Sequence, residues 1–161
     1  MGASWLLKQG SDHAEPWNRK SESHGSTMTD HDSHETPHCS FQRIAPRVLL
    51  QRFKPEARFS QTILEEVAAA RNLIIGDMPC ALLVCIPEEV PIDPDATNTD
   101  HFLGERDKRR ILALALVAHG DVMRSVSKFY FTWFPQPFPA RVFDTEEEAL
   151  AWLQAEEEAA M

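Results

Sequence analysis

Two short stretches without a polar side chain most constrain the fold of this 161-residue chain, Ala81–Ile86 and Ile111–Val117. Runs of this length are typical of strands, and a strand that is apolar on both faces has to be covered on both sides. Each stretch leads toward a segment with helical periodicity. The pattern therefore predicts an α/β fold with a parallel sheet, right-handed crossovers and helices on its faces.

The segments before these runs predict a hairpin and a helix. Phe41–Ile44 and Val48–Phe53 are two strand candidates, separated by a tight turn that contains a proline. Ser60 is expected to cap a helix from Gln61 to Leu73, because a serine hydroxyl can accept from a free N–H group of the first turn. Arg71 and the Gly-Asp turn that follows mark the expected end of this helix.

The segment after the second run predicts a helix, a strand and a last helix. Asp121 is expected to cap the first helix, and the prolines at 135, 137 and 139 end it. One apolar stripe on that helix is expected to face the core; it consists of Val122, Val126, Phe129, Tyr130 and Trp133. Arg141–Phe143 is a strand candidate. Thr145 and Glu148 then have capping-box spacing at the start of the last helix.

The charge distribution indicates one domain between two polar ends. Residues 1–40 hold 3 basic and 6 acidic residues (net −3), residues 41–143 hold 13 and 12 (net +1), and residues 144–161 hold 0 and 7 (net −7). We interpret 1–40 as a disordered arm, 41–155 as the domain and 156–161 as an acidic tail. Met28 offers a second plausible start, and the sequence leaves open whether residues 1–27 are native. The near-neutral middle argues against a nucleic-acid partner.

The chain has three cysteines, Cys39, Cys80 and Cys85, which cannot all pair with one another. Cys80 and Cys85 lie five residues apart in one apolar segment, so on a strand they point to opposite faces. Free cysteines fit a reducing compartment, and we expect the protein to be cytoplasmic. No stretch approaches the roughly 18 apolar residues of a membrane span, so we expect no membrane insertion.

A histidine-rich motif in the arm has two interpretations. His31, His34, His38 and Cys39 form the pattern H-x2-H-x3-H-C, and imidazole ligands suit zinc, copper or nickel. The simpler interpretation is a polar tail that binds metal only adventitiously, because its Ser, Asp and Thr residues disfavour a helix that would align the ligands. We expect no metal site and no cofactor.

The candidates for small-ligand contacts follow the two apolar runs. Residues 87–100 form a long loop rich in proline and acidic residues, and open α/β folds keep their sites at the carboxyl ends of the strands. His119, Gly120 and Asp121 stand where a strand gives way to a helix, so backbone N–H groups there could receive an anion. His119 could carry a proton. Because no nucleophile or second base accompanies it, we expect no enzymatic activity.

The element order and two stretches, 52–70 (RFKPEARFSQTILEEVAAA) and 138–153 (FPARVFDTEEEALAWL), resemble the STAS domain. They are more closely similar to the bacterial STAS-like proteins labelled SpoIIAA-like, over about residues 41–155. The resemblance implies a mixed, mostly parallel sheet of about five strands with an N-terminal hairpin and about four helices. It also implies a non-enzymatic module with a regulatory role, which binds a partner protein or a small ligand.

A phosphorylation site is a further property of the anti-sigma-factor antagonists in this family, in which a Ser or Thr at the start of the second helix is modified. In this chain Cys85-Ile86-Pro87 replaces the Asp-rich turn before that helix, and Thr97 and Thr99 are the hydroxyls near the equivalent point. A phosphate at a helix N-terminus is favoured by the helix dipole and opposed by nearby aspartates. Helix capping by Thr99 or Asp100 is the simpler interpretation.

The aromatic residues of the helix that starts at Asp121 are the candidates for a protein contact. Members of the apolar stripe are expected to pack in the core. Phe131 and Phe134 lie off the stripe, so they are the candidates for a partner surface or a homodimer contact. We therefore expect a protein–protein interaction module. The alternative is a lipid- or nucleotide-binding domain that uses the loop at 87–100 and the helix start at 119–121.

Overall fold

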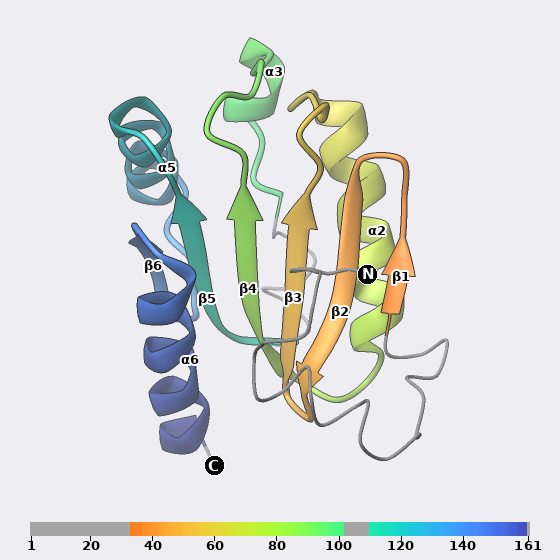
Figure 1. The fold of residues 1–161 in the computed structure, drawn as a ribbon, viewed down its shortest axis with the longest axis vertical. Helices are drawn as coiled ribbons and strands as arrows, with labels where there is room; N and C mark the ends of the chain where they lie inside the picture. The colour runs from red at the N-terminus through yellow and green to blue at the C-terminus, as the bar shows by residue number, and fades with distance from the viewer. Residues whose placement is uncertain (1–32, 102–109, 161) are drawn as a thin grey trace, which may run out of the picture. The chain divides into compact units, whose positions relative to one another are not determined.

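Six strands form one sheet in the computed structural model, which describes residues 33–101 and 110–160 (Figure 1). The strands are β1 (Ser33–Glu35), β2 (Cys39–Ala45), β3 (Val48–Phe53), β4 (Cys80–Ile86), β5 (Ile111–Ala118) and β6 (Ala140–Phe143), and they lie in chain order. The pairs β1–β2 and β2–β3 are antiparallel, whereas the pairs from β3 to β6 are parallel. The predicted fold class is confirmed, with six strands rather than about five.

The two apolar runs form the centre of this sheet, as predicted. Every residue of β4 is buried, and β4 pairs in parallel with β5, where Leu82 lies opposite Leu114. Each face of the sheet has its own apolar core, as a strand buried on both sides requires. Cys80 belongs to one core and Cys85 to the other, so their side chains point to opposite faces as predicted. All three cysteines are free.

Helices cover both faces of the sheet (Figure 1). The helices within the described residues are α2 (Gln61–Ile75), α3 (Pro94–Thr97), α5 (Asp121–Trp133) and α6 (Glu146–Ala160). Val67 of α2 and Met123 of α5 join Leu82 in the core on one face. Leu153 of α6 packs in the core on the other face, which contains Leu83. None of the helices in the described ranges is long and apolar enough to cross a membrane.

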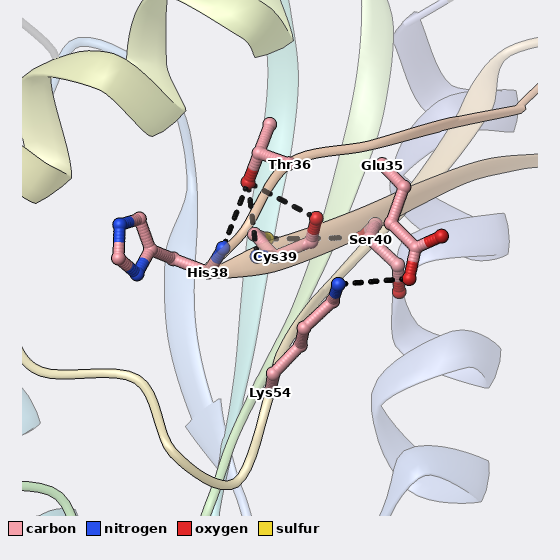
Figure 2. A network of polar contacts seen from close by, with 6 residues as sticks. All are labelled: Glu35, Thr36, His38, Cys39, Ser40 and Lys54. Atoms are coloured by element: carbon pink, nitrogen blue, oxygen red, sulfur yellow. Dashed lines mark hydrogen bonds and ion pairs between the residues drawn. The ribbon is translucent and has the colours of Figure 1, made fainter.

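The folded domain begins earlier than predicted. The expected disordered arm extends to residue 40, but β1 begins at residue 33 and Cys39 is fully buried. The Thr36 hydroxyl fixes the turn between β1 and β2, because its Oγ1 accepts from the backbone N–H groups of His38 and Cys39 at 3.2 and 3.0 Å (Figure 2). Lys54 Nζ lies 2.8 Å from the Glu35 carboxylate. The three residues of β1 are polar and exposed, so the sequence has no apolar alternation from which this strand could be predicted.

The N-cap of α2 is the predicted one, but the helix is longer than expected. Ser60 Oγ accepts from the backbone N–H group of Ile63 at 3.2 Å, which confirms the predicted N-cap. The helix continues for two residues beyond its expected end, and Gly76 then turns the chain with a φ of 65°, a value that favours glycine. Arg71 therefore lies within α2, where it is only 3% exposed.

The starts of α5 and α6 differ in how well the sequence predicted them. Gly120, with a φ of 84°, occupies the N-cap position of α5, and Asp121 is the first helical residue rather than the cap. Thr145 Oγ1 accepts from the backbone N–H group of Glu148 at 3.2 Å, as the capping-box spacing predicted. Because α6 extends to residue 160, most of the expected acidic tail is helical.

The face that α5 turns to the sheet is not the predicted one. Val122, Phe129 and Trp133 of the expected core stripe are 73%, 64% and 66% exposed. Met123 and Ser127 are instead buried, at 5% and 7%. The helix is strongly amphipathic, but the side that packs lies beside the centre of its apolar stripe and includes the polar Ser127, so periodicity alone did not identify it. Phe129 and Trp133 therefore face outward, whereas Val126 and Tyr130 of the same stripe are half-buried.

Candidate functional site

A pocket of about 120 Å³ lies on the face of the sheet that α2 and α5 cover. Its floor consists of side chains from the three central parallel strands, including Phe53 of β3, Ile86 of β4 and Leu116 of β5. Val67 of α2 and Val126 of α5 contribute to its walls. The lining is mostly apolar, and it lies toward the carboxyl ends of the strands, where open α/β sheets usually bind ligands.

Three buried polar side chains interrupt this apolar lining: Gln51, Arg71 and Ser127 are 3%, 3% and 7% exposed. Gln51 lies on β3, two residues from Leu49 and Phe53, so all three side chains point to the same face. Its Oε1 has no hydrogen-bond partner within the described part of the chain. Arg71 Nη2 donates to the backbone carbonyl of His101 at 3.4 Å.

His101, Tyr130 and the middle of the β4–β5 loop form a hydrogen-bonded corner of the pocket. Tyr130 Oη accepts from the backbone N–H group of His101 and donates to the Thr99 carbonyl, each at 2.9 Å. His101 Nε2 lies 2.8 Å from the Ala96 carbonyl, so this nitrogen carries the proton, because a carbonyl can only accept. The imidazole also stacks on the Tyr130 ring, with centroids 6.0 Å apart.

The imidazole of His101 is held in its neutral form. Burial lowers the pKa of His101 below its ordinary value, and the positive charge of Arg71 acts in the same direction. The hydrogen bond to Ala96 and the carboxylates of Asp100 and Glu65 oppose this shift without reversing it. At neutral pH the pocket therefore holds the guanidinium charge of Arg71 beside a neutral imidazole.

The predicted ligand residues divide between the pocket and another part of the molecule. The loop at 87–100 supplies Ile92, Ala96 and Thr97 to the pocket lining. His119, Gly120 and Asp121 are not part of that lining; His119 and Asp121 are exposed. The Asp121 carboxylate pairs with Arg124 one turn along α5. The start of the loop does lie beside Gly120, where a Cβ atom would be 3.6 Å from Glu88 Cγ, but neither of these residues lines the pocket.

The candidate phosphoacceptors lie at the end of the short helix α3 and just after it. Thr97 is the last residue of α3, and its hydroxyl donates to the Pro94 carbonyl at 2.9 Å. The Thr99 hydroxyl donates to the Asp95 carbonyl at 3.1 Å. Residues 102–109, which follow these threonines, lie outside the described residues, so phosphorylation at Thr97 or Thr99 stays a prediction.

The candidate partner residues and metal ligands also have defined positions. Phe131 is half-buried and lines the pocket, and the ring of Phe134 lies 5.1 Å from that of Tyr130. His34 lies on β1, and the half-buried His38 lies in the following turn, with its ring directed away from Glu35 and Lys54 (Figure 2). The third candidate ligand, His31, lies outside the described residues. Within the described ranges, no three His, Cys, Asp or Glu residues are grouped to hold a metal ion.

A second polar group lies on the opposite face of the sheet. Arg52 of β3 donates twice to the Glu146 carboxylate at the start of α6, at 2.6 and 3.0 Å. Burial acts to raise the pKa of Glu146, but the hydrogen bonds and charge of Arg52 outweigh it and the pKa is lowered. Burial and then the Glu146 carboxylate raise the pKa of the neighbouring Cys85 thiol. Cys85 is therefore protonated at neutral pH and is not an activated nucleophile.

Sequence reasoning did not identify Gln51, Arg71 or His101 as site residues, although two of them had a detectable signal. Gln51 lies on β3, two residues from both Leu49 and Phe53, so its polar side chain points to the same buried face as theirs. Arg71 lies four residues after Val67, on the apolar face of its helix. A polar residue at a core position is the pattern that could have indicated a site. His101 lies in a loop and has no such signal.

Comparison with known proteins places this geometry in a fold family. The family model described as "Domain of unknown function (DUF7793)" matches residues 43–157. A solved structure of an uncharacterized protein from Shewanella loihica PV-4, of the DUF3478 family and with a SpoIIAA-like fold, matches with a TM-score of 0.50 at 15% identity. The match covers 74% of this chain and 98% of the other. No curated protein matches the chain. The likeness confirms the predicted STAS-like, SpoIIAA-like fold.

Proposed function

This chain belongs to the family described as Domain of unknown function (DUF7793), and for this STAS-like module we propose a binding function without catalysis. Its ligand is a small, mostly apolar molecule that occupies the pocket between α2, α5 and the sheet. The observation that supports this proposal is an apolar pocket that contains a few buried polar groups, Gln51, Arg71 and Ser127. Such a combination is typical of ligand sites, in which apolar walls provide affinity and polar groups fix orientation.

The size of the pocket limits the ligand. Its volume is about 120 Å³, whereas an engineered apolar cavity of about 150 Å³ holds one benzene molecule. The pocket therefore suits a single ring or a short branched chain. Sites for drug-sized molecules have volumes of roughly 300–1,000 Å³, so the proposal does not extend to a nucleotide or a long-chain lipid.

The test is a titration with a neutral probe, benzyl alcohol, followed by NMR shifts of the backbone amides. We expect saturable shifts at residues that line the pocket. Ser127→Leu fills the pocket and should weaken probe binding about tenfold or more, with no loss of thermal stability, because cavity-filling changes are commonly tolerated. Ser125→Leu, on the exposed side of the same helix, is the matched control. Shifts that do not saturate, or equal effects of both variants, would count against the proposal.

A second proposed function is protein contact through the outer face of α5, defined as Val122, Phe129 and Trp133. These side chains are 73%, 64% and 66% exposed, and positions i, i+7 and i+11 lie along one side of a helix. The rings of Phe129 and Trp133 stack, with centroids 5.8 Å apart. A row of exposed apolar side chains that includes tryptophan is typical of interaction surfaces.

The partner to test first for this second function is another copy of the chain. Sedimentation velocity of the wild type should show a concentration-dependent dimer, and the double variant Phe129→Ser, Trp133→Ser should sediment as a monomer. Ser125→Leu is again the control, because it lies outside the outer face of α5. A wild type that stays monomeric at the highest attainable concentration would exclude self-association through this face.

A further inference from the structure

The amide of Gln51 gives the pocket a hydrogen-bonding preference that its apolar walls do not explain. This side chain is 3% exposed and lines the pocket from β3, and no group in the described part of the chain donates to its Oε1 atom. We propose that the pocket selects neutral ring compounds with one hydrogen-bond donor, such as a phenol, whose O–H group donates to Gln51 Oε1. This inference rests on the proposed ligand-binding function and names the class of ligand.

The side chains that surround Gln51 on the sheet cannot donate to it. Phe41 of β2 and Val84 of β4 are its Cα partners on the two neighbouring strands. Leu49 and Phe53 lie two residues away on β3, and all four side chains belong to the core on this face. Because apolar side chains have no hydrogen-bond donor, a donor can reach the Gln51 side chain only from the pocket.

The donors of the pocket lining are directed elsewhere. The hydroxyl groups of Thr97 and Tyr130 and the Nε2 atom of His101 each donate to a backbone carbonyl of residues 94–99. Neither these groups nor the side chains of Arg71 and Ser127 donate to Gln51 Oε1. A buried acceptor without a donor is unfavourable. A ligand that supplies the donor therefore gains binding free energy that a purely apolar ligand does not.

The surroundings of Gln51 favour an organic donor over a single water molecule. A buried water is typically held by two to four polar partners, whereas the neighbours of Gln51 on the sheet are apolar. The pocket volume of about 120 Å³ is also much larger than the roughly 10–15 Å³ that one water needs. A ring with one hydroxyl group fills the apolar space and pairs with the single acceptor.

The decisive comparison uses phenol and toluene, which differ only in an O–H group in place of a methyl group. A pocket without an acceptor would prefer toluene, because burying an unpaired hydroxyl is unfavourable. We expect the full-length protein to bind phenol about tenfold more tightly than toluene, as a neutral hydrogen bond to an otherwise unpaired acceptor predicts. Benzonitrile, which only accepts hydrogen bonds, should bind no more tightly than toluene. Dissociation constants are measured by NMR titration at pH 7.

The variant Gln51→Leu tests whether the amide causes this preference. It should fold, because leucine has a similar volume and suits the apolar neighbours on the sheet. Its affinity for phenol divided by its affinity for toluene should fall to about one or below, and a loss of affinity common to both probes does not change this ratio. Gln154→Leu makes the same substitution at an exposed position of α6 and should keep the wild-type ratio.

The wild type offers a second readout that needs no variant. The side-chain carbonyl carbon of Gln51 should shift downfield in carbon-13 spectra when phenol is added, because a hydrogen bond to Oε1 polarises the carbonyl group. Toluene should shift it less. Equal shifts with the two probes would contradict the contact with Gln51, even if Gln51→Leu does not fold.

The outcomes separate this inference from the proposed function. If the wild type binds toluene as tightly as phenol, the pocket binds ligands but the donor preference is wrong. If phenol is preferred and Gln51→Leu keeps the wild-type ratio, the hydroxyl is recognised elsewhere and the assignment to Gln51 is overturned. If benzonitrile binds more tightly than phenol, the site donates rather than accepts, which also contradicts the inference. If neither phenol nor toluene binds, the proposed ligand-binding function fails together with it.

Discussion

His101 connects three parts of the molecule through its backbone and its ring. Its N–H group donates to Tyr130 of α5, its carbonyl accepts from Arg71 of α2, and its Nε2 donates to Ala96 of α3. These bonds hold the middle of the β4–β5 loop against two helices. Since the ring is partly buried and its pKa is lowered, protonation of His101 would place a second positive charge near that of Arg71.

This arrangement predicts that stability falls as the pH is lowered from 7 to 5. The unfolded chain protonates His101 near its ordinary pKa of about 6.5, whereas the folded protein resists protonation, so protons favour the unfolded state in this range. Urea midpoints measured from pH 7 to 5 should decrease in the wild type and decrease less in His101→Asn. The exposed His34, changed to Asn, is the matched control. Identical pH dependence in the wild type and His101→Asn would contradict the prediction.

Helix α5 shows how far a helical pattern can determine packing. The sequence predicted its existence and its C-terminal end near the prolines, but placed Val122, Phe129 and Trp133 in the core. The side that packs is instead marked by Met123 and Ser127, at 5% and 7% exposure. Because the buried side is offset from the centre of the apolar stripe, the side that packs depends on the shape of the sheet below, which no local pattern contains.

The orientation of α5 predicts a large loss of stability for one substitution and almost none for a substitution at the adjacent residue. Met123→Ala should lower the free energy of unfolding by about 2–4 kcal/mol, because it removes a buried side chain from a packed core. Val122→Ala should change it by no more than about 0.5 kcal/mol, because this side chain is mostly in solvent. Urea denaturation of both variants measures the difference. A larger loss for Val122→Ala than for Met123→Ala would show that the helix is rotated to the side that the sequence pattern favoured.

The elements with the strongest local patterns were the most predictable. β4 and β5 agree with their apolar runs to within one residue at each end, and Ser60 and Thr145 cap their helices as expected. β1 has no apolar residue, so its pairing with β2 depends on the Thr36 turn and not on burial. The buried polar residues of the pocket were not predicted, because they come from segments 20 and 30 residues apart and meet only in the folded protein.

On the scale of the whole molecule, the strands at the centre of the sheet are more deeply buried than those at its edges. β4 and β5 are covered by α2 and α5 on one face and by α6 on the other, whereas all three residues of β1 are exposed. The family match begins at residue 43, within β2, so the first hairpin lies at the boundary of the shared fold. Elements with few buried contacts open at lower free energy than the core.

Hydrogen exchange should therefore separate the sheet into an outer and a central part. Amides of β4 and β5 should exchange only through global unfolding, so their opening free energies should equal the total stability and fall steeply with urea. Amides of β1 that donate to β2 should exchange through local openings that urea hardly affects, because little surface is exposed in such an opening. Exchange measured by mass spectrometry in increasing urea resolves the two classes. Equal opening free energies for β1 and β4 would instead show that the first hairpin unfolds together with the core, and that the cooperative unit begins at Ser33 rather than within β2.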